Sequence, residues 1–272
     1  MSHNLLKGKR GIIFGALNDR SIAWKVAQVA HAEGASFTLT NAPIALRMGE
    51  INKLAEECGG AEVIPADATS MEDLENLLTK SMEVLGGKID FILHSIGMSP
   101  NVLKGRAYGD LNYDWMVKSL DVSAMSFHRL MQTAEKLDAM NEWGSIMGLS
   151  YIAAQRTFPD YSDMAQAKAL LESIARSYGE RFGRLKKVRV NTISQSPTMT
   201  TAGEGVGGFD VFFDYADKMS PLGNASAEDC ANYTVMFFSD FTKMVTMQNL
   251  YHDGGFSSSG ITDALIEQLK KE

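Results

Sequence analysis

Short runs of apolar and β-branched residues alternate along this 272-residue chain with longer stretches in which apolar residues recur every three or four positions. Continuously apolar runs are typical of strands covered on both faces, whereas the longer recurrence is typical of helices. Strands are predicted at Gly11–Phe14, Ser36–Thr40, Glu62–Pro65, Asp90–His94, Ser145–Leu149, Val188–Ile193 and Asn249–His252. Helices are predicted near 21–33, 44–58, 70–85, 111–140, 160–183 and 226–239.

The repeated order of strand and helix indicates how the chain folds. Such an alternation predicts a mostly parallel sheet with helices on both of its faces. No linker, repeat or low-complexity segment interrupts the pattern. The chain is therefore predicted to be a single-domain α/β protein over residues 1–272, with a Rossmann-like, doubly wound parallel sheet of about seven strands.

The segment at about 195–218 departs from this regular pattern. It holds several glycines and then an apolar patch, namely Gly203, Gly205, Gly207 and Gly208, followed by Phe209, Val211, Phe212, Phe213 and Tyr215. A glycine-rich hinge followed by aromatic side chains is typical of a lid over an apolar substrate. An ordinary long loop with a docked helix is the alternative.

Composition and charge exclude several classes of function. The net charge of −7 and the pI near 5.3 argue against binding to nucleic acid or to an anionic membrane surface. Cys58 and Cys230 match neither a metal-ligand spacing nor a disulfide framework, so no metal site is predicted. The N-terminus lacks the apolar stretch of a signal peptide, and no apolar run approaches the roughly 18 residues that span a bilayer. A cytoplasmic protein is expected.

The turn after the first predicted strand has features of a nucleotide-binding turn. Ligands of open α/β sheets bind beyond the carboxyl ends of the strands. Gly15 ends the first strand, and Ser21 and Ile22 begin a helix whose free N–H groups suit a pyrophosphate. The turn holds one glycine rather than the G-x-G-x-x-G spacing, so an ordinary strand–helix turn is the alternative.

Three further strand ends refine the prediction of a dinucleotide. The small residues among Ser95, Ile96 and Gly97 would let a cofactor lie against the backbone. At Asn41, neither an acidic residue for the ribose of NAD nor an arginine for the phosphate of NADP is present. NADH is preferred because no basic cluster is evident, and NADPH stays open. Asp67 is a candidate acceptor for the adenine amino group, or else a turn or capping carboxylate.

Tyr161 and Lys168 are the candidates for the chemical centre. With Tyr161 in the first turn of the predicted helix, a spacing of seven residues is close to two turns, or roughly 10 Å of rise. Hydride delivery to an α,β-unsaturated thioester creates an enolate, which a phenolic O–H binds more strongly as its charge grows. Lys168 would donate to the nicotinamide ribose, and Tyr151 would be a second donor or a wall. An incidental Tyr…Lys pair is the alternative.

Motifs along nearly the whole chain point in the same direction. They are Gly15 with residues 19–24, residues 94–97, Tyr151 with Arg156, residues 159–161 with Lys168, residues 188–194 and residues 252–256. From about Lys9 to Phe256 the chain resembles the bacterial NADH-dependent enoyl-acyl-carrier-protein reductases, a divergent branch of the short-chain dehydrogenase/reductase family. A Tyr-x6-Lys spacing separates this branch from family members with Tyr-x3-Lys.

The resemblance implies an enzyme that reduces trans-2-enoyl thioesters, on acyl-carrier protein or coenzyme A, in fatty-acid elongation, usually as a homotetramer. It implies catalytic roles for Tyr151, Tyr161 and Lys168. With the candidates above, the predicted cofactor contacts are Gly15, Ser21, Ile22, Asn41, Asp67, Ala68, Ser95, Ile96, Gly97, Lys168, Pro197, Thr198, Met199, Thr200 and Thr201. The predicted substrate contacts are Met98, Ser99, Tyr151 and Tyr161.

Three departures from the family pattern stand out. Asn41-Ala42 takes the place where many relatives have a ribose-binding glutamine, and Gln195-Ser196 replaces Ala-Gly, which predicts a differently seated loop. The lid carries Asp210, Asp214 and Asp217, although an acidic carrier protein prefers a basic landing site. A carbonyl or dienoyl reductase on the same scaffold, or a catalytically silent NAD(P)-sensing protein, is the alternative function.

Overall fold

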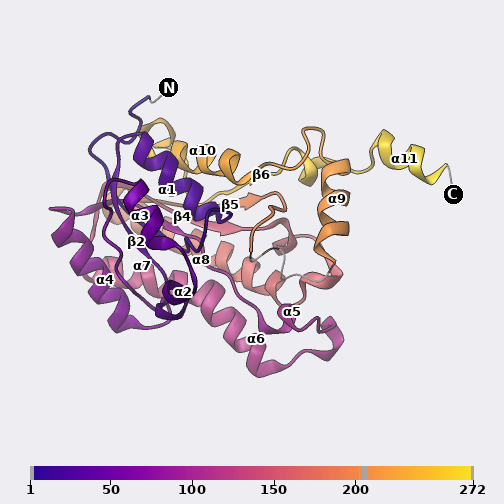
Figure 1. The fold of residues 1–272 in the computed structure, drawn as a ribbon, viewed down its shortest axis with the longest axis horizontal. Coiled ribbons are helices and arrows are strands. Elements are labelled where there is room, and N and C mark those ends of the chain that lie inside the picture. Colours follow the sequence, from indigo (N-terminus) through magenta and orange to yellow (C-terminus); the bar gives the residue numbers. More distant parts are fainter. Residues whose placement is uncertain (1–2, 202, 204–207, 271–272) are drawn as a thin grey trace.

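A parallel sheet forms the centre of the protein. The computed structural model describes residues 3–201, 203 and 208–270, and within them six strands form one parallel sheet in the order β2-β1-β3-β4-β5-β6 (Figure 1). The strands are β1 (Arg10–Phe14), β2 (Ser36–Thr40), β3 (Ile89–His94), β4 (Met140–Ser150), β5 (Arg189–Gln195) and β6 (Asn249–His252). The predicted doubly wound parallel sheet is confirmed, with six strands where about seven were expected.

The missing strand is the segment predicted at Glu62–Pro65. It lies beside β2 but forms a single parallel bridge, between Leu39 and Val63. Two hydrogen bonds make this bridge, from Leu39 N to Glu62 O and from Ile64 N to Leu39 O, each 2.9 Å long. The prediction of a full strand is wrong because the apolar run continues the sheet edge for one residue pair only.

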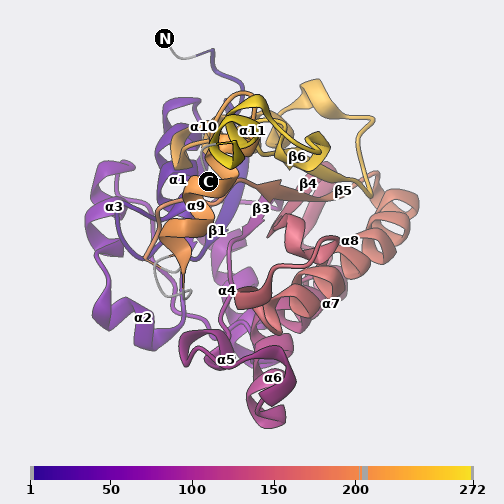
Figure 2. The same ribbon diagram turned by 90° about the vertical axis from the view of Figure 1, so that its right-hand side faces the viewer.

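Helices cover both faces of the sheet, as the apolar strands require. On one face α1 (Ile22–Ala32), α3 (Ile51–Glu57) and α10 (Ala227–Phe238) bury their apolar sides against strand residues such as Phe37 and Phe91. On the other face lie α4 (Met71–Val84), α7 (Ser126–Lys136) and α8 (Met164–Lys186). The views in Figures 1 and 2 show these two layers.

Two of the predicted helices are interrupted in the structure. The helix expected at 44–58 is divided into α2 (Pro43–Met48) and α3, because Gly49 and Glu50 approach the preceding loop closely. Glu50 N donates to Leu17 O at 2.8 Å, and a Cβ on Gly49 would lie 2.5 Å from that same oxygen. The helix expected at 111–140 consists of α6 (Tyr113–Leu120), a π-helical turn at Asp121–Met125, and α7.

The remaining elements lie at one end of the molecule, beyond the carboxyl ends of the strands. They include the short α5 (Pro100–Leu103), α9 (Phe209–Met219) and α11 (Asp263–Leu269). Figures 1 and 2 show α9 and α11 standing out from the sheet, with the C-terminus at the tip. Of the helices in the described part of the chain, none has the length and apolar character to cross a bilayer.

Candidate active site

The connections of the sheet create a crevice between β1 and β3. The chain leaves β1 for β2 on one side and returns to β3 on the other, so the carboxyl ends of β1 and β3 flank the point where the winding reverses. Ligands of such sheets bind in this crevice. Gly15 lies there with φ of 92°, and a Cβ on it would lie 1.9 Å from Ser95 O. Only glycine fits this position.

We expect the substitution Gly15→Ala to lower the free energy of unfolding by about 3 kcal/mol, because it combines a positive φ with overpacking against a main-chain oxygen. Gly60→Ala is the matched control, since Gly60 has φ of 81° and no atom within 4 Å of a built Cβ. Urea unfolding of both variants separates the two causes. Equal losses in the two variants would show that contact with Ser95 is not what excludes a side chain.

Ser21 organises the turn that follows Gly15. Its Oγ accepts hydrogen bonds from Leu17 N at 3.1 Å and from Asn18 N at 3.2 Å. Ile22 then begins α1 and is partly buried against the core below. The turn is therefore held by a side chain from the helix start, which leaves the first N–H groups of α1 without acceptors from a capping side chain.

Side chains predicted to face the adenosine end of a dinucleotide bond to other groups of the protein. Asn41 Nδ2 donates to Ala16 O at 3.2 Å, which ties the end of β2 to the crevice. Asp67 is exposed, and its Oδ1 accepts from Thr69 N at 2.9 Å and Thr69 Oγ1 at 2.7 Å. This is the bonding pattern of a turn carboxylate. Ala68 beside it is buried.

The residues after β3 pass directly beside the candidate chemical centre. Gly97 is exposed, and a Cβ on it would lie 3.3 Å from Met164 Cε and 3.6 Å from Lys168 Nζ. Met98 is held by both of its main-chain atoms, because Ser123 Oγ accepts from Met98 N at 2.9 Å and donates to Met98 O at 3.1 Å. A ligand lying against Gly97 would therefore also contact the lysine.

Tyr161 does not lie in the first turn of a long helix, and that prediction is wrong. It ends a 3-10 turn at Pro159–Tyr161, and α8 begins three residues later at Met164. Ser162 interrupts the two with φ of 45° and ψ of −132°, a conformation that L-residues rarely adopt. The two-turn rise between Tyr161 and Lys168 therefore does not apply. Tyr161 packs against the cluster of Val102, Met164 and Ala167, and a Cβ on Gly97 would lie close to both Met164 Cε and Lys168 Nζ.

The structure brings the two candidate tyrosines together. The rings of Tyr151 and Tyr161 have centroids 5.0 Å apart at an interplanar angle of 55°. Burial raises the pKa of both phenols, and for Tyr151 the neighbouring Tyr161 and Asp253 raise it further. The Tyr151 hydroxyl is buried without a hydrogen-bond partner among the described residues. Both phenols therefore keep their protons at neutral pH and act as donors toward a bound acceptor.

Lys168 is buried on α8 with one defined partner. Its Nζ donates to Leu149 O at 2.7 Å, which leaves two of its three donors for a ligand. Burial lowers the pKa of this ammonium to about 8, and Glu172 one helical turn later opposes the shift. Glu172 is itself buried and accepts from Ser150 Oγ at 2.6 Å and from Gln155 Nε2 at 3.3 Å.

His94, at the end of β3, has a structural position. Its ring is buried, and its Nε2 lies 2.8 Å from Ser126 Oγ, which in turn donates to Val122 O. Burial, and next the charge of Lys168, lowers the pKa of this imidazole to about 3. The ring is therefore neutral at physiological pH, so Lys168 carries the positive charge at this end of the sheet.

The loop after β5 is seated by the two residues that depart from the family pattern. Gln195 Oε1 accepts from His252 Nδ1 at 2.7 Å, and Gln195 Nε2 donates to Thr198 Oγ1 at 3.2 Å. Ser196 Oγ accepts from Ala225 N at 3.1 Å. Pro197, which follows Ser196, is buried. These polar side chains therefore fix the loop to β6 and to the segment before α10.

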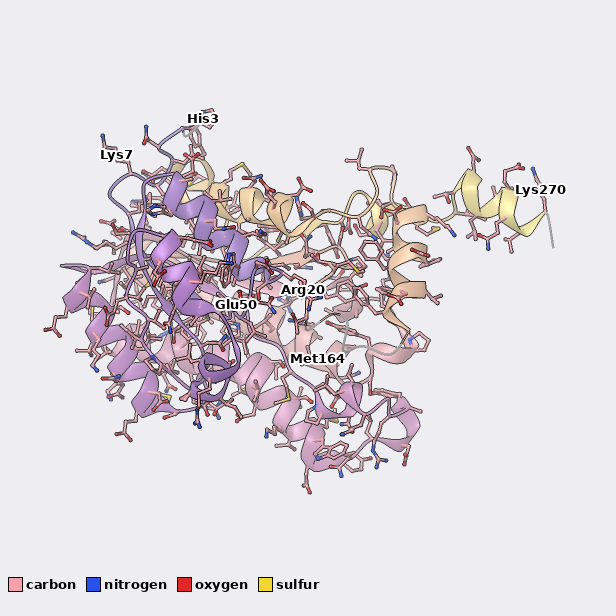
Figure 3. All side chains as sticks on the ribbon, in the orientation of Figure 1. His3, Lys7, Arg20, Glu50, Met164 and Lys270 are labelled. Atoms are coloured by element: carbon pink, nitrogen blue, oxygen red, sulfur yellow. The ribbon has the colours of Figure 1, made fainter. Side chains whose placement is uncertain are left out.

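The same loop reaches across to the turn after β1. Thr201 Oγ1 accepts from Asn18 Nδ2 at 2.9 Å and from Arg20 at 3.1 Å. Met199 is exposed, whereas the Thr200 hydroxyl accepts from Gly203 N at 3.0 Å. Figure 3 labels Arg20 in the central region, with Met164 below it. The two loops predicted to hold a cofactor thus meet over the crevice.

Aromatic residues from three segments surround a cavity beside the tyrosine pair. The rings of Phe158 and of Phe212 in α9 are in edge-to-face contact, with centroids 4.8 Å apart. The centroid of the Phe212 ring lies 6.0 Å from that of Tyr151. The cavity has a volume of about 490 Å³. Its lining includes Ile152, Arg156, Phe158, Pro159, Phe212, Tyr215, Met219 and Phe256. We call it the aromatic cavity.

The predicted lid at 195–218 is partly visible. Gly205 and Gly207, two of its predicted hinge glycines, lie outside the described residues. Its aromatic patch forms α9, in which Phe209 is buried and Val211 is 77% exposed. The helix therefore turns Phe212 toward the tyrosines and presents a different side outward.

Comparison with known proteins identifies the family. The family model for enoyl-(acyl-carrier-protein) reductase matches residues 15–257. An NADH-dependent enoyl-acyl-carrier-protein reductase of Rickettsia bellii is 37% identical over 96% of this chain and 98% of its own length. The structure of the FabI–NADH complex from Alistipes finegoldii is 64% identical, covers 96% of this chain and 92% of its own, and gives a TM-score of 0.95. The chain therefore belongs to the enoyl-acyl-carrier-protein reductase family.

Proposed function

We propose that this protein is an oxidoreductase that reduces the carbon–carbon double bond of trans-2-enoyl thioesters with NADH, in fatty-acid elongation. The observation that carries the proposal is the pair of protonated phenols, Tyr151 and Tyr161, of which Tyr151 contacts the cavity residues Phe158 and Phe212. The buried Lys168 bonds to Leu149 O, two residues before Tyr151. Membership of the enoyl-acyl-carrier-protein reductase family, with relatives whose names specify NADH, supports the same reaction.

The crevice at β1 and β3 fits a dinucleotide. Gly15 lets the ends of β1 and β3 approach closely, the exposed Gly97 has no side chain beside Lys168, and the first N–H groups of α1 have no capping side chain. We assign the pyrophosphate to Gly15, Ser21 and Ile22, and the adenosine end to Asn41, Asp67 and Ala68. The nicotinamide half would contact Ser95 to Gly97, Lys168, and Pro197 to Thr201.

Each residue at the chemical centre has a separate task. NADH, when bound, would supply a hydride to the β-carbon of the enoyl group, and a proton from solvent at the α-carbon would complete the reduction. As negative charge develops on the thioester oxygen, the Tyr161 O–H donates a hydrogen bond that strengthens with that charge. Lys168 holds the ribose with its two remaining donors and keeps a positive charge near the same oxygen. Tyr151 supports the Tyr161 ring and offers a second donor to the substrate.

The acyl chain of the substrate is assigned to the aromatic cavity, under a lid formed by α9. Phe158 and Phe212 provide apolar walls, and a cavity of about 490 Å³ suits a ligand of moderate size. Met98 and Ser99, on the loop after β3, are assigned as further substrate contacts. Because Ser99 Oγ donates to Asp163 rather than into the cavity, Ser99 would act through its main chain.

The carrier of the thioester poses a separate question. Asp210, Asp214 and Asp217 on α9 give this helix an acidic outer face, with only Lys218 as a basic neighbour. An acidic carrier protein is repelled there. We propose that the carrier docks on a different face, or that coenzyme A thioesters are also used. The protein would work in the cytoplasm as a homotetramer, as the family resemblance implies.

Single-turnover oxidation of NADH and of NADPH, each with crotonyl-coenzyme A, tests the proposal. We expect NADH to be oxidised rapidly with the enoyl thioester and much more slowly with a simple ketone of similar size. Preference for the ketone would indicate a carbonyl reductase, and cofactor binding without oxidation by either substrate would indicate a sensing protein. Faster oxidation of NADPH than of NADH would overturn the cofactor assignment.

A further inference from the structure

A buried carboxylate lies two residues after Tyr161. Asp163 is fully buried and accepts three side-chain hydrogen bonds. Its Oδ1 accepts from Ser99 Oγ at 2.5 Å, and its Oδ2 accepts from Asn101 Nδ2 at 2.8 Å and from Ser119 Oγ at 3.0 Å. All of these donors are themselves buried. We call these four residues the Asp163 cluster.

The charge of Asp163 is balanced without a cation. Within the described part of the chain, no lysine, arginine or histidine forms an ion pair with it. Asp163 occupies the N-cap position of α8, a 23-residue helix, so the positive end of the helix dipole lies beside it. A buried carboxylate is tolerated only when its oxygens are well bonded. The Asp163 carboxylate therefore requires its three neutral donors, and its charge in turn fixes each donor in place.

The donors come from segments far from α8 in the sequence. Ser99 caps α5 by accepting from Val102 N at 3.1 Å. Asn101 is bonded to both main-chain groups of Asn112, the residue that caps α6. Ser119 lies at the end of α6. The Asp163 cluster thus joins the loop after β3 and both ends of α6 to the start of α8.

The cluster fixes the chain on both sides of the chemical centre. On one side Asp163 adjoins Ser162, whose φ of 45° is strained and persists only if the surroundings hold it. Ser162 connects directly to Tyr161. On the other side Ser99 follows Met98, whose main chain is held by Ser123 of the π-helical turn. The Asp163 carboxylate therefore fixes the position of the Tyr161 segment relative to the loop at Met98.

We propose that Asp163 is a positioning residue that sets the Tyr161 hydroxyl relative to the substrate loop at Met98–Asn101. This role rests on the proposed enoyl-thioester reduction. It acts on geometry alone, because Asp163 does not line the aromatic cavity and both of its oxygens are bonded within the cluster. None of the residues assigned to NADH is a member of the cluster, so we expect binding of NADH not to depend on it.

The substitution Asp163→Asn tests this role while keeping the side-chain shape. An amide NH2 group then faces donors, so the cluster loses at least one bond. We expect kcat/KM for crotonyl-coenzyme A to fall about tenfold, since small misplacements of reacting groups are costly. We expect the Kd for NADH, measured by fluorescence, to stay within about twofold. Ser119→Ala, which removes one donor from a small residue, should give a weaker change in the same direction.

Thr38→Val is the matched control for lost stability. Thr38 is also fully buried and its Oγ1 bonds to Ser81 Oγ at 2.7 Å, in the middle of β2 and away from the site. We expect it to lower the melting temperature without changing kcat/KM. An Asp163→Asn enzyme with wild-type kcat/KM, or a Thr38→Val enzyme with the same loss as Asp163→Asn, would overturn the proposal.

Hydrogen–deuterium exchange provides a readout that needs no turnover. In Asp163→Asn we expect faster exchange in peptides covering 97–103 and 158–165, with unchanged exchange in peptides of β2. Unchanged exchange in all of these segments would refute the positioning role even in a protein that reduces enoyl thioesters. If the wild-type protein fails to oxidise NADH with any enoyl thioester, the proposed function fails, while altered exchange would still show that Asp163 holds the two segments.

Discussion

Replacing Tyr161 with phenylalanine should slow hydride transfer to an enoyl thioester by 10²–10³-fold, equivalent to about 3–4 kcal/mol of lost transition-state stabilisation. The phenol is the donor placed beside the cavity with its pKa raised by burial, so it remains protonated throughout the neutral range. Phenylalanine keeps the ring that packs on Tyr151 at 5.0 Å. Stopped-flow measurement of NADH oxidation under single-turnover conditions reports the chemical step directly.

A tyrosine within α8 provides the control. Tyr178 of α8 packs against Phe182 and His128, on the face of the sheet away from the cavity. Tyr178→Phe should leave both the hydride-transfer rate and the Kd for NADH unchanged. If Tyr161→Phe turns over at the wild-type rate, the hydroxyl has no catalytic role and Tyr151 becomes the candidate donor.

Removal of the Lys168 ammonium should weaken NADH binding about 30-fold, because charged hydrogen bonds contribute about 2 kcal/mol. Lys168→Ala loses two ligand donors and also the bond to Leu149 O. Lys168→Met keeps most of the aliphatic stem, so a similar loss in both variants assigns the effect to the amine. Fluorescence titration with NADH measures both. An unchanged Kd in Lys168→Met would remove Lys168 from the cofactor site.

The pH dependence of the same titration tests the burial of Lys168. Its pKa is lowered to about 8 in the free protein, so the side chain is charged below that pH and neutral above it. NADH binding should therefore weaken as the pH rises through about 8 in the wild-type protein. In Lys168→Met the Kd should not change over this range. A flat wild-type profile would show that the charge makes no contribution.

The sequence predicted the sheet well, for a clear physical reason. Strands that are covered on both faces are continuously apolar, and they stand out between helices whose apolar residues recur every three or four positions. The segment at Glu62–Pro65 has the same local pattern, but pairing also depends on how a segment meets its neighbouring strand. Here only Val63 pairs with β2, through Leu39. Local pattern also did not reveal the break at Gly49, which results from the approach of Leu17 O.

The geometry of the candidate site was harder to predict than the identity of its candidates. The Tyr151 and Tyr161 rings lie together, yet the helical spacing argument for Tyr161 failed at Ser162. A serine with positive φ gives no sequence signal, because its conformation depends on a cluster assembled from distant segments. Asp163 was missed for the same reason, since its three partners are 44 to 64 residues away. Glu172 lies four residues after Lys168 in a predicted helix, so the sequence could have indicated that the two side chains lie on the same face.

The tight contact between Gly15 and Ser95 bears on how products leave. With no room for even a methyl group, the ends of β1 and β3 form a fixed wall that cannot widen without breaking the main-chain packing. The opposite wall is held by side-chain bonds such as those of Thr201 with Asn18 and Arg20, which open at far lower cost. We therefore expect the crevice to open by separation of Thr201 from the turn after β1, and not by separation of β1 from β3.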